Sequence, residues 1–308
     1  MLPPDFTFPA DPSALWPLAV GRPLAGLVMA GQRLGDWQLA NWHGQTIPGL
    51  WQRADAWVSA EDAAGLRAAG PGHVLIIPDG TPLAGIPWAD PARPPVRLPA
   101  GPASFLLVHP WDLLRLNEQL VGQLGADDIR GELSPAAHIN GRLVLGEESR
   151  VLPGVYIEGK VIIGRNCKIG PNCHVRGNTS IGDNCHIGQS VEIKNCLIGS
   201  RSHVGHLSYV GDSVLGDGVN LGAGTITANF RHDGKNHRSM VDGGLVDTGR
   251  RKFGAILGDG VHTGIHTSIY PGRKIGPGAT TRPGEIVRQD RMSGVDLGAT
   301  GKNPAEFQ

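Results

Sequence analysis

Aliphatic residues recur at every sixth position through much of the second half of the chain, with polar residues and glycine between them. A period of six fits neither the roughly 3.6 residues of a helical turn nor the alternation of a half-buried strand. It predicts a coil in which each hexad forms one side and about three hexads complete a turn. The uninterrupted run is Leu145, Val151, Ile157, Ile163, Ile169, Val175, Ile181, Ile187 and Ile193.

The period continues after two slips and one long interruption. One residue is missing before Ile198 and another before Leu215, and residues 227–254 interrupt the repeats. Residues one turn apart should stack on strands about 4.8 Å apart, at a spacing of eighteen residues before the slips and seventeen across each slip. The hexads resume at Leu257, Thr263, Ile269, Ile275, Thr281 and Val287.

Small residues accompany the aliphatic ones. Glycine directly follows many of them, as at Gly164 and Gly182, and we expect these glycines to allow turns with dihedrals that side chains disfavour. The place four residues after the aliphatic one suits a second, tighter inward position. It is occupied by Ser149, Val155, Cys167, Cys173 and Cys185.

All four cysteines of the chain lie within the repeats, and none forms a Cys-x-x-Cys pair. Cys167 and Cys185 are eighteen residues apart, so they should be neighbours on adjacent turns. Buried packing is the favoured role for the cysteines, with a redox or metal role as the alternative.

The first part of the chain has a different composition. All seven tryptophans fall between Trp16 and Trp111, whereas the repeats contain none. This break predicts a small α/β domain at residues 1–130, the repeat coil at residues 131–290 and a polar tail at residues 291–308.

Within the first domain, we expect short buried strands at His73–Ile77 and Phe105–Val108, because each is a brief apolar run near turn residues. Residues 111–124 carry apolar side chains at helical spacing and therefore predict an amphipathic helix. These elements make the first domain α/β.

Charge and hydropathy argue against several classes of partner. Lys+Arg and Asp+Glu both number 28, so the net charge indicates neither nucleic acid nor a membrane surface. No apolar run approaches the roughly 20 residues of a membrane span, and the first residues lack the basic and apolar regions of a signal peptide. A cytoplasmic location is therefore expected.

The stacking rule brings two cations together. Arg176 and Lys194 are eighteen residues apart, at a place where most hexads have glycine. Two such charges repel by on the order of 3 kcal/mol at an effective dielectric constant of about 20. A bound anion would offset this repulsion, and a phosphate suits a guanidinium and an ammonium group. Glu158 lies one turn earlier in the same column, so a structural ladder of ion pairs is the alternative.

Two further pairs stack across a slip: Glu192 with Tyr209, and His206 with Ala223. Ala223 lies in a Gly-Ala-Gly turn whose backbone N–H groups should be free to point outward. A base beside such a donor suits acyl transfer, because one removes a proton from the nucleophile while the other stabilises the oxyanion. A histidine with only a surface position is the alternative. We expect the imidazole and the two stacked cations to share one cleft.

The interruption at residues 227–254 is longer than most loops in a compact domain, which favours a function for it. It is rich in basic residues, Lys235 among them. It either binds a polyanion or is a solvent-exposed surface loop without a binding role.

Three stretches carry a resemblance to a known family: Ser190-Val-Glu-Ile-Lys194, Gly205-His-Leu-Ser-Tyr-Val-Gly-Asp212 and Val219-Asn-Leu-Gly-Ala-Gly-Thr-Ile-Thr-Ala-Asn229. They resemble the acetyltransferase domain of the bifunctional N-acetylglucosamine-1-phosphate uridylyltransferase/glucosamine-1-phosphate acetyltransferases, over about residues 135–290. The run Thr248-Gly-Arg-Arg-Lys-Phe-Gly-Ala255 is closer to a variant sugar-1-phosphate nucleotidylyltransferase-like subgroup. The resemblance implies a mainly β fold, a left-handed parallel β-helix of hexapeptide repeats, and a homotrimer.

The resemblance also implies catalytic and cofactor residues. His206 corresponds to the general base that deprotonates the 2-amino group of the sugar, and Asn220 to a residue that contacts the sugar or supports the base. The backbone N–H of Ala223 corresponds to a donor near the thioester carbonyl. Asn229 and Lys235 lie where the family binds acetyl-CoA, often with a neighbouring subunit.

On the substrate side, Arg176, Lys194 and Tyr209 correspond to the residues that hold the sugar phosphate, in agreement with the stacked cations. Glu192 corresponds to a sugar-contacting or base-supporting residue. The resemblance implies no metal ligand in this domain.

The first domain departs from the family. Residues 1–130 lack the glycine-rich loop that cradles a nucleoside triphosphate, so we expect a shortened relic or a docking domain. The chain is therefore expected to transfer acetyl groups from acetyl-CoA to an amino-sugar 1-phosphate, with glucosamine-1-phosphate favoured, in nucleotide-sugar synthesis. Two alternatives stay open: retained nucleotidyl transfer with UTP or dTTP and Mg²⁺, and a non-catalytic scaffold that binds a sugar phosphate.

Overall fold

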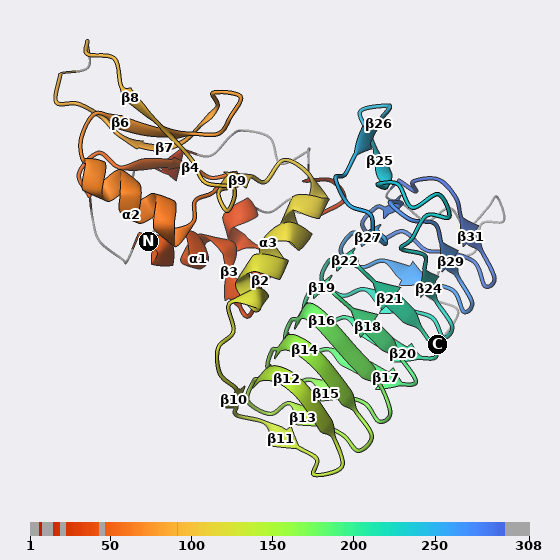
Figure 1. Cartoon of the computed structure of the whole chain (residues 1–308). Coiled ribbons are helices and arrows are strands. Elements are labelled where there is room, and N and C mark those ends of the chain that lie inside the picture. Colours follow the sequence, from red (N-terminus) through yellow and green to blue (C-terminus); the bar gives the residue numbers. More distant parts are fainter. Residues whose placement is uncertain (1–5, 8–14, 19–22, 43–46, 91, 293–308) are drawn as a thin grey trace.

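The structure, a computed structural model, describes residues 6–7, 15–18, 23–42, 47–90 and 92–292. A small N-terminal domain with three α-helices leans against a tall coil of short parallel strands (Figure 1). The mainly β fold predicted from the hexads, a parallel β-helix preceded by a small α/β domain, is confirmed. The predicted tail lies almost wholly outside the described residues.

Two sheets build the coil. One face is a seven-stranded sheet that consists of β11 (Glu132–Leu133), β13 (Arg150–Val151), β15 (Lys168–Ile169), β17 (His186–Gln189), β20 (His203–His206), β23 (Asn220–Leu221) and β28 (His262–Thr263). A thirteen-stranded sheet wraps the other two faces, because a long strand such as β16 (His174–Ile181) pairs with β18 (Glu192–Lys194) at its start and with β19 (Leu197–Ile198) at its end. Its strands are β10 (Asp128–Ile129), β12 (His138–Leu145), β14 (Tyr156–Ile163), β16 (His174–Ile181), β18 (Glu192–Lys194), β19 (Leu197–Ile198), β21 (Tyr209–Gly211), β22 (Val214–Leu215), β24 (Ile226–Thr227), β27 (Ile256–Leu257), β29 (Ser268–Ile269), β30 (Lys274–Ile275) and β31 (Ile286–Val287).

The strand register confirms the spacing rule. Arg176 pairs with Lys194, eighteen residues on, and Glu192 pairs with Tyr209, seventeen residues on. The aliphatic residues of the hexads fill the interior of the coil as one buried cluster. The small residues four places later are buried as well, at exposures of 0–2%.

Gly170, which follows Ile169, has the predicted positive φ of 100°, but other glycines after the aliphatic residues are needed for a different reason. Gly164 and Gly182 do not have a positive φ. A Cβ on Gly182 would lie 2.7 Å from the backbone nitrogen of Ser200 on the next turn, so the close stacking of turns demands glycine. Asparagines such as Asn166 and Asn184 take left-handed corners instead, with φ of 54° and 58° and their amides 2.7 Å apart.

The cysteines are free and buried, as expected for packing residues. The backbone N–H of Cys185 lies 3.4 Å from Sγ of Cys167, so these two are neighbours on adjacent turns. Burial raises the pKa of the Cys173 and Cys196 thiols to about 12, which keeps them protonated. Among the described residues, no group of three or more His, Cys, Asp or Glu side chains is placed to hold a metal ion.

The N-terminal domain contains a five-stranded sheet in the order β1 (Phe6–Thr7), β4 (Trp51–Arg53), β7 (Pro82–Ile86), β6 (His73–Ile76) and β8 (Val96–Pro99). Its helices are α1 (Leu34–Asn41), α2 (Ala60–Ala69) and α3 (Pro110–Gly122), with short elements η2 (Leu24–Gly26), β2 (Val28–Met29), β3 (Gln32–Arg33), β5 (Ala56–Trp57) and β9 (Phe105–Leu106). The two predicted strands and the predicted helix are confirmed within a few residues. No helix in the described part of the chain is long and apolar enough to cross a membrane.

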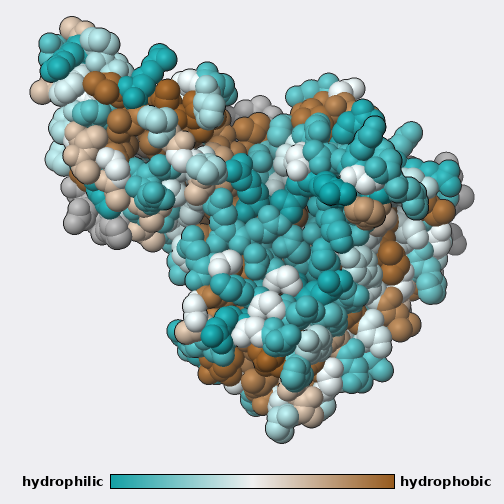
Figure 2. Space-filling view, in the orientation of Figure 1, coloured by the Kyte–Doolittle hydropathy of each residue, from teal (hydrophilic) through white to brown (hydrophobic). Residues whose placement is uncertain are grey.

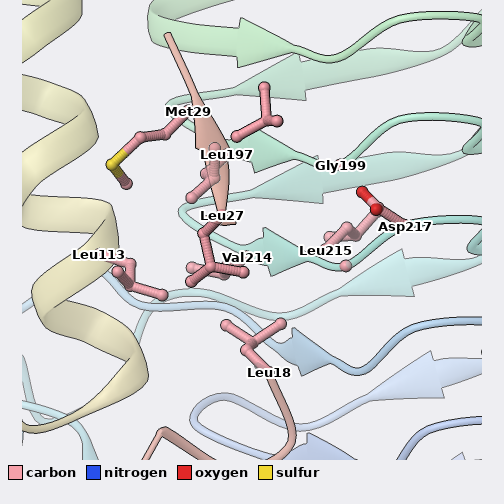
Figure 3. Close-up of a pocket in the computed structure, with 11 residues that line it drawn as sticks. Leu18, Leu27, Met29, Leu113, Leu197, Gly199, Val214, Leu215 and Asp217 are labelled. Atoms are coloured by element: carbon pink, nitrogen blue, oxygen red, sulfur yellow. The ribbon is translucent and has the colours of Figure 1, made fainter. Parts of the chain in front are cut away.

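One apolar cluster joins the N-terminal domain to the coil. Leu113 of α3 belongs to the same buried cluster as Leu197 and Val214 of the coil. Figure 3 shows Leu27 and Met29 facing these residues around a cavity of about 20 Å³. Because this space is about the size of a single water, the contact is a packed core and not a ligand site.

The interruption in the repeats folds as an antiparallel hairpin of β25 (Arg238–Val241) and β26 (Gly244–Asp247). It leaves the coil after β24 and returns before β27, and it projects beside the first turn of α3 in Figure 1. Arg250, just after the hairpin, forms an ion pair with Glu118 of α3. The insertion is therefore tied to the N-terminal domain.

Candidate active site

The two stacked cations each have a carboxylate partner within the chain. Arg176 forms an ion pair of 2.6 Å with Glu192, and Lys194 forms one of 2.8 Å with Asp212. The repulsion that suggested a bound phosphate is therefore relieved internally. Ion pairs are therefore present, but not in the ladder that was considered, because Glu158 contacts His174 at 3.2 Å and not Arg176.

Donors nevertheless remain for a ligand. The Arg176 side chain is 34% exposed and its guanidinium has five N–H groups, while the Lys194 ammonium has three and is 16% exposed. Glu192 engages only Nε and Nη2 of Arg176, and Asp212 accepts a single Lys194 bond. An anion at this surface would find unoccupied donors on both cations.

Asp212 organises this part of the site, and the sequence analysis did not single it out. Its side chain is only 4% exposed. Besides Lys194, it accepts hydrogen bonds from Nδ2 of Asn195 at 3.1 Å and from Nδ2 of Asn229 at 2.6 Å. A usable signal was present, since Asp212 follows Asn195 by seventeen residues, which is the spacing of stacked residues across a slip.

Tyr209 and Asn229 belong to the same network. Nδ2 of Asn229 donates to the Tyr209 hydroxyl at 2.9 Å as well as to Asp212. Burial, then Asp212 and Glu192, raise the pKa of Tyr209 above its ordinary value, so the phenol stays protonated. Asn229, expected near the cofactor, thus reaches the predicted phosphate side.

His206 lies around a corner from the cations. It is the exposed last residue of β20, in the seven-stranded sheet, whereas Arg176 and Lys194 lie in the thirteen-stranded sheet. The expectation that the imidazole is on the same side of the coil as the cations is therefore wrong. The residue spacing predicts which residues stack on successive turns, but it does not predict where within a turn the chain bends from one face to the next. Here the chain bends at Leu207, which has a φ of 52°. His206 and Tyr209 flank this corner.

The backbone near Ala223 has the predicted placement. The Gly224 N–H donates to the His206 carbonyl at 3.1 Å, so Ala223 lies one turn beyond His206. In the described part of the chain, neither the Ala223 N–H nor the His206 ring makes a hydrogen bond within the protein. Asn220 pairs with His203 and not with His206, so it lies three residues away along the strand.

A shallow pocket of about 540 Å³ lies at the same corner. This corner pocket is lined by Tyr156, His174, Glu192, Leu207 and Tyr209, among others. It contains two of the predicted substrate residues. The aromatic ring of Tyr156 and the imidazole of His174, with centroids 5.0 Å apart, extend it along the coil and were not anticipated.

A second pocket of about 540 Å³ lies between the start of the insertion and the following turns. This loop pocket is lined by Phe230, Arg231, His232 and Tyr270, among others. Phe230 and Tyr270 are 50% and 46% exposed, which is unusual for aromatic rings outside an interface or a ligand site. Lys235 lies in the same loop, and its backbone N–H donates to Asp233 at 3.2 Å.

The larger domain is a parallel β-helix of hexapeptide repeats with a polar site along one edge. Residues 157–277 match the family model described as GMPPB C-terminal domain. A curated relative, the bifunctional sugar-1-phosphate nucleotidylyltransferase/acetyltransferase of Sulfurisphaera tokodaii, is 41% identical over 181 residues, which are 59% of this chain and 45% of the relative. The bifunctional protein GlmU of Methanococcus maripaludis strain C7 is 52% identical over 168 residues, 54% of this chain and 40% of the relative.

The C-terminal part of the chain is thus similar to these bifunctional proteins. The chain spans less than half the length of both relatives. Among solved structures, AntD, an N-acyltransferase from Bacillus cereus in complex with dTDP and 3-hydroxybutyryl-CoA, matches 57% of this chain and 80% of its own, with 16% identity and a TM-score of 0.24.

Proposed function

We propose that the chain is an N-acetyltransferase that moves the acetyl group of acetyl-CoA to the amino group of an amino-sugar 1-phosphate, with glucosamine-1-phosphate as the first candidate. One observation carries this proposal. The ring of His206 and the N–H of Ala223, which make no hydrogen bond among the described residues, lie on one side of the corner at Leu207, and the sheet that carries the stacked Arg176 and Lys194 begins on the other side. The Sulfurisphaera tokodaii relative, a bifunctional sugar-1-phosphate nucleotidylyltransferase/acetyltransferase, supports the same chemistry.

The sugar phosphate occupies the thirteen-stranded side of the corner in this proposal. The free donors of Arg176 and Lys194 take the phosphate, because a fork of N–H groups and a point charge together suit its oxygens. The Tyr209 hydroxyl, which stays protonated, donates to the same ligand. Glu192 lies beside it and accepts from a sugar hydroxyl.

The acetyl group is transferred directly, without an acyl-enzyme. The sugar nitrogen attacks the thioester carbon as His206 takes the proton from the nitrogen. The N–H of Ala223 donates to the oxyanion of the tetrahedral intermediate. The carbon–sulfur bond then breaks, and the proton on His206 passes to the departing thiolate. Asn220, on the same sheet, contacts the substrate from one side.

Acetyl-CoA occupies the loop pocket. The exposed rings of Phe230 and Tyr270 offer faces for an adenine, and Arg231 and Lys235 offer cations for its phosphates. Asn229, which precedes Phe230, links this pocket to the phosphate side of the site. The proposal keeps acetyl-CoA as a substrate and assigns no metal to the transfer.

A homotrimer belongs to the proposal. Side chains exposed at the edge of the coil include Leu207 at 63%, Ile226 at 40%, Ile265 at 51% and Ile286 at 49%. Figure 2 shows apolar patches at the right-hand edge of the coil, beside a hydrophilic front face. Such a row of exposed aliphatic residues is typical of a surface that another subunit covers.

The packing of α3 on the coil favours a docking role for the N-terminal domain over retained nucleotidyl transfer. Nucleotidyl transfer, with Mg²⁺ and UTP or dTTP, would release pyrophosphate from a sugar phosphate, and its absence across a panel of substrates would remove that hypothesis. A scaffold without activity would bind glucosamine-1-phosphate and leave acetyl-CoA intact.

The direct test is to incubate the purified chain with acetyl-CoA and glucosamine-1-phosphate and to follow free thiol together with the N-acetylated sugar phosphate. Equal amounts of both products are expected. Binding of the sugar phosphate without thiol release across a panel of amino-sugar phosphates would contradict the proposal and favour the scaffold.

A further inference from the structure

Glu118 on the inner side of α3 reaches the coil close to the candidate site. One carboxylate oxygen, Oε1, accepts a hydrogen bond from Nδ2 of Asn195 at 2.6 Å. The same carboxylate forms the ion pair with Arg250 of the insertion, in which Nη1 and Oε2 are 3.1 Å apart. Its side chain is 28% exposed and that of Arg250 is 17% exposed. Three segments that are far apart in the sequence therefore meet at this one carboxylate.

Asn195 extends the contact into the site. Its single amide nitrogen has two N–H groups, and it lies within hydrogen-bond distance of both Glu118 and Oδ1 of Asp212, the latter at 3.1 Å. The backbone holds the side chain in place, because Asn195 has a φ of 52° and its N–H donates to the Arg176 carbonyl at 2.9 Å. Asn195 thus bridges the carboxylate of the N-terminal domain and the carboxylate that holds Lys194.

The path has an ion pair at each end. Arg250 pairs with Glu118, the neutral amide of Asn195 separates the two carboxylates, and Asp212 pairs with Lys194. Loss of Glu118 would leave the largely buried Arg250 without its carboxylate and would free the Asn195 amide to turn toward Asp212. Any such turn changes how Asp212 holds Lys194.

We propose that Glu118 is a positioning residue, through which the docked N-terminal domain and the insertion set the geometry of Lys194 and so the affinity for the phosphate of the substrate. This inference rests on the proposed function of Lys194. It adds a role for a domain that lacks the glycine-rich loop of a nucleotide site: the domain acts on the acetyl-transfer site through one hydrogen-bonded path.

Asn117, the preceding residue of α3, offers a matched control. Its Nδ2 donates to the carbonyls of Asn178 and Cys196 at 3.0 and 3.3 Å, and its Oδ1 accepts from Ser180 at 2.5 Å. None of these partners is Asp212 or Lys194. Asn117→Ala therefore weakens the same docking surface without cutting the path to the site.

The experiment compares Glu118→Ala, Glu118→Gln and Asn117→Ala in the full chain by steady-state kinetics. Glu118→Ala should raise KM for glucosamine-1-phosphate by about three- to tenfold, the size of one lost hydrogen bond, with KM for acetyl-CoA unchanged. Glu118→Gln should recover part of this affinity, because the amide oxygen still accepts from Asn195. An unchanged KM in Glu118→Ala, or an equal rise in Asn117→Ala, would overturn the inference.

A second measurement separates this inference from the proposed function. The Asp212 amide donates to the Lys194 carbonyl at 2.7 Å, so its hydrogen exchange reports the path without any substrate. Glu118→Ala should speed this exchange by about tenfold over the change in Asn117→Ala. If the wild type shows no acetyl transfer but this exchange difference is found, only the proposed function fails. If acetyl transfer is found without the difference in exchange or in KM, only the role of Glu118 fails.

Discussion

Lys194 and Asp212 are joined by an ion pair of 2.8 Å in which the lysine side chain is 16% exposed and the aspartate only 4%. The cation that the hexad spacing brings to the site is therefore held by a carboxylate eighteen residues further on. This carboxylate fixes where the ammonium group points, and so where an anionic ligand can meet it.

Replacement of Asp212 by alanine should lower the free energy of unfolding by about 2–4 kcal/mol, because it leaves Lys194 without a partner and breaks bonds to Asn195 and Asn229. Urea denaturation measures the loss. The control is Asp233→Ala, whose partner Arg231 and whose own side chain are 32% and 43% exposed, and which should change stability much less. Equal losses in the two variants would contradict the role of Asp212.

Arg176→Ala should raise KM for glucosamine-1-phosphate by about tenfold or more and leave KM for acetyl-CoA unchanged, since one of two phosphate-binding cations is lost. Arg150→Ala removes an arginine from the seven-stranded sheet that is 62% exposed and pairs with Glu132, and it should leave both constants unaltered. A sugar-phosphate KM that is the same in Arg176→Ala and the wild type would remove the phosphate assignment.

His237 makes stability depend on pH. Its side chain is buried, Nε2 donates to the Asn229 carbonyl at 2.9 Å, and burial holds its pKa below the ordinary value of about 6.5. The unfolded chain binds a proton more readily here, so this contribution to stability is present above the ordinary pKa and falls as the pH drops below it. Urea midpoints between about pH 7.5 and pH 5.5 should fall less in His237→Gln than in the wild type. Parallel pH profiles would show that His237 does not act in this way.

Sedimentation velocity should show the wild type as a trimer. Leu207, which is 63% exposed and has a φ of 52°, is a suitable position to test whether the edge of the coil is the subunit interface. Asparagine tolerates the left-handed conformation, so Leu207→Asn should weaken association without loss of fold. A wild type that sediments only as a monomer would contradict a shared cofactor site.

Counting residues was enough to predict which strands stack. The pairing of Arg176 with Lys194, and that of Glu192 with Tyr209, follow from the hexad period, because parallel turns repeat at a constant chain length. The same count could not show on which side of a corner His206 lies, because corners depend on backbone dihedrals such as that of Leu207.

The sequence also could not predict those hydrogen-bond and ion-pair partners that depend on the direction of a side chain. Arg250 meets Glu118 across 132 residues, because the insertion and α3 converge on one face of the coil. Asn229 was expected at the cofactor but bonds Asp212, since its amide is directed along the coil. The close approach of turns at Gly182 is likewise a property of the packed coil and not of a local dihedral.

The central claim is that the corner at Leu207 carries out acetyl transfer with His206 as the base. The most direct measurement is the rate of thiol release from acetyl-CoA with glucosamine-1-phosphate in the wild type, in His206→Ala and in His203→Ala, which removes the other exposed histidine of β20. Loss of the base should slow the reaction by about 100-fold or more, whereas His203→Ala should stay within about twofold of the wild type. A rate in His206→Ala equal to that of the wild type would contradict the account.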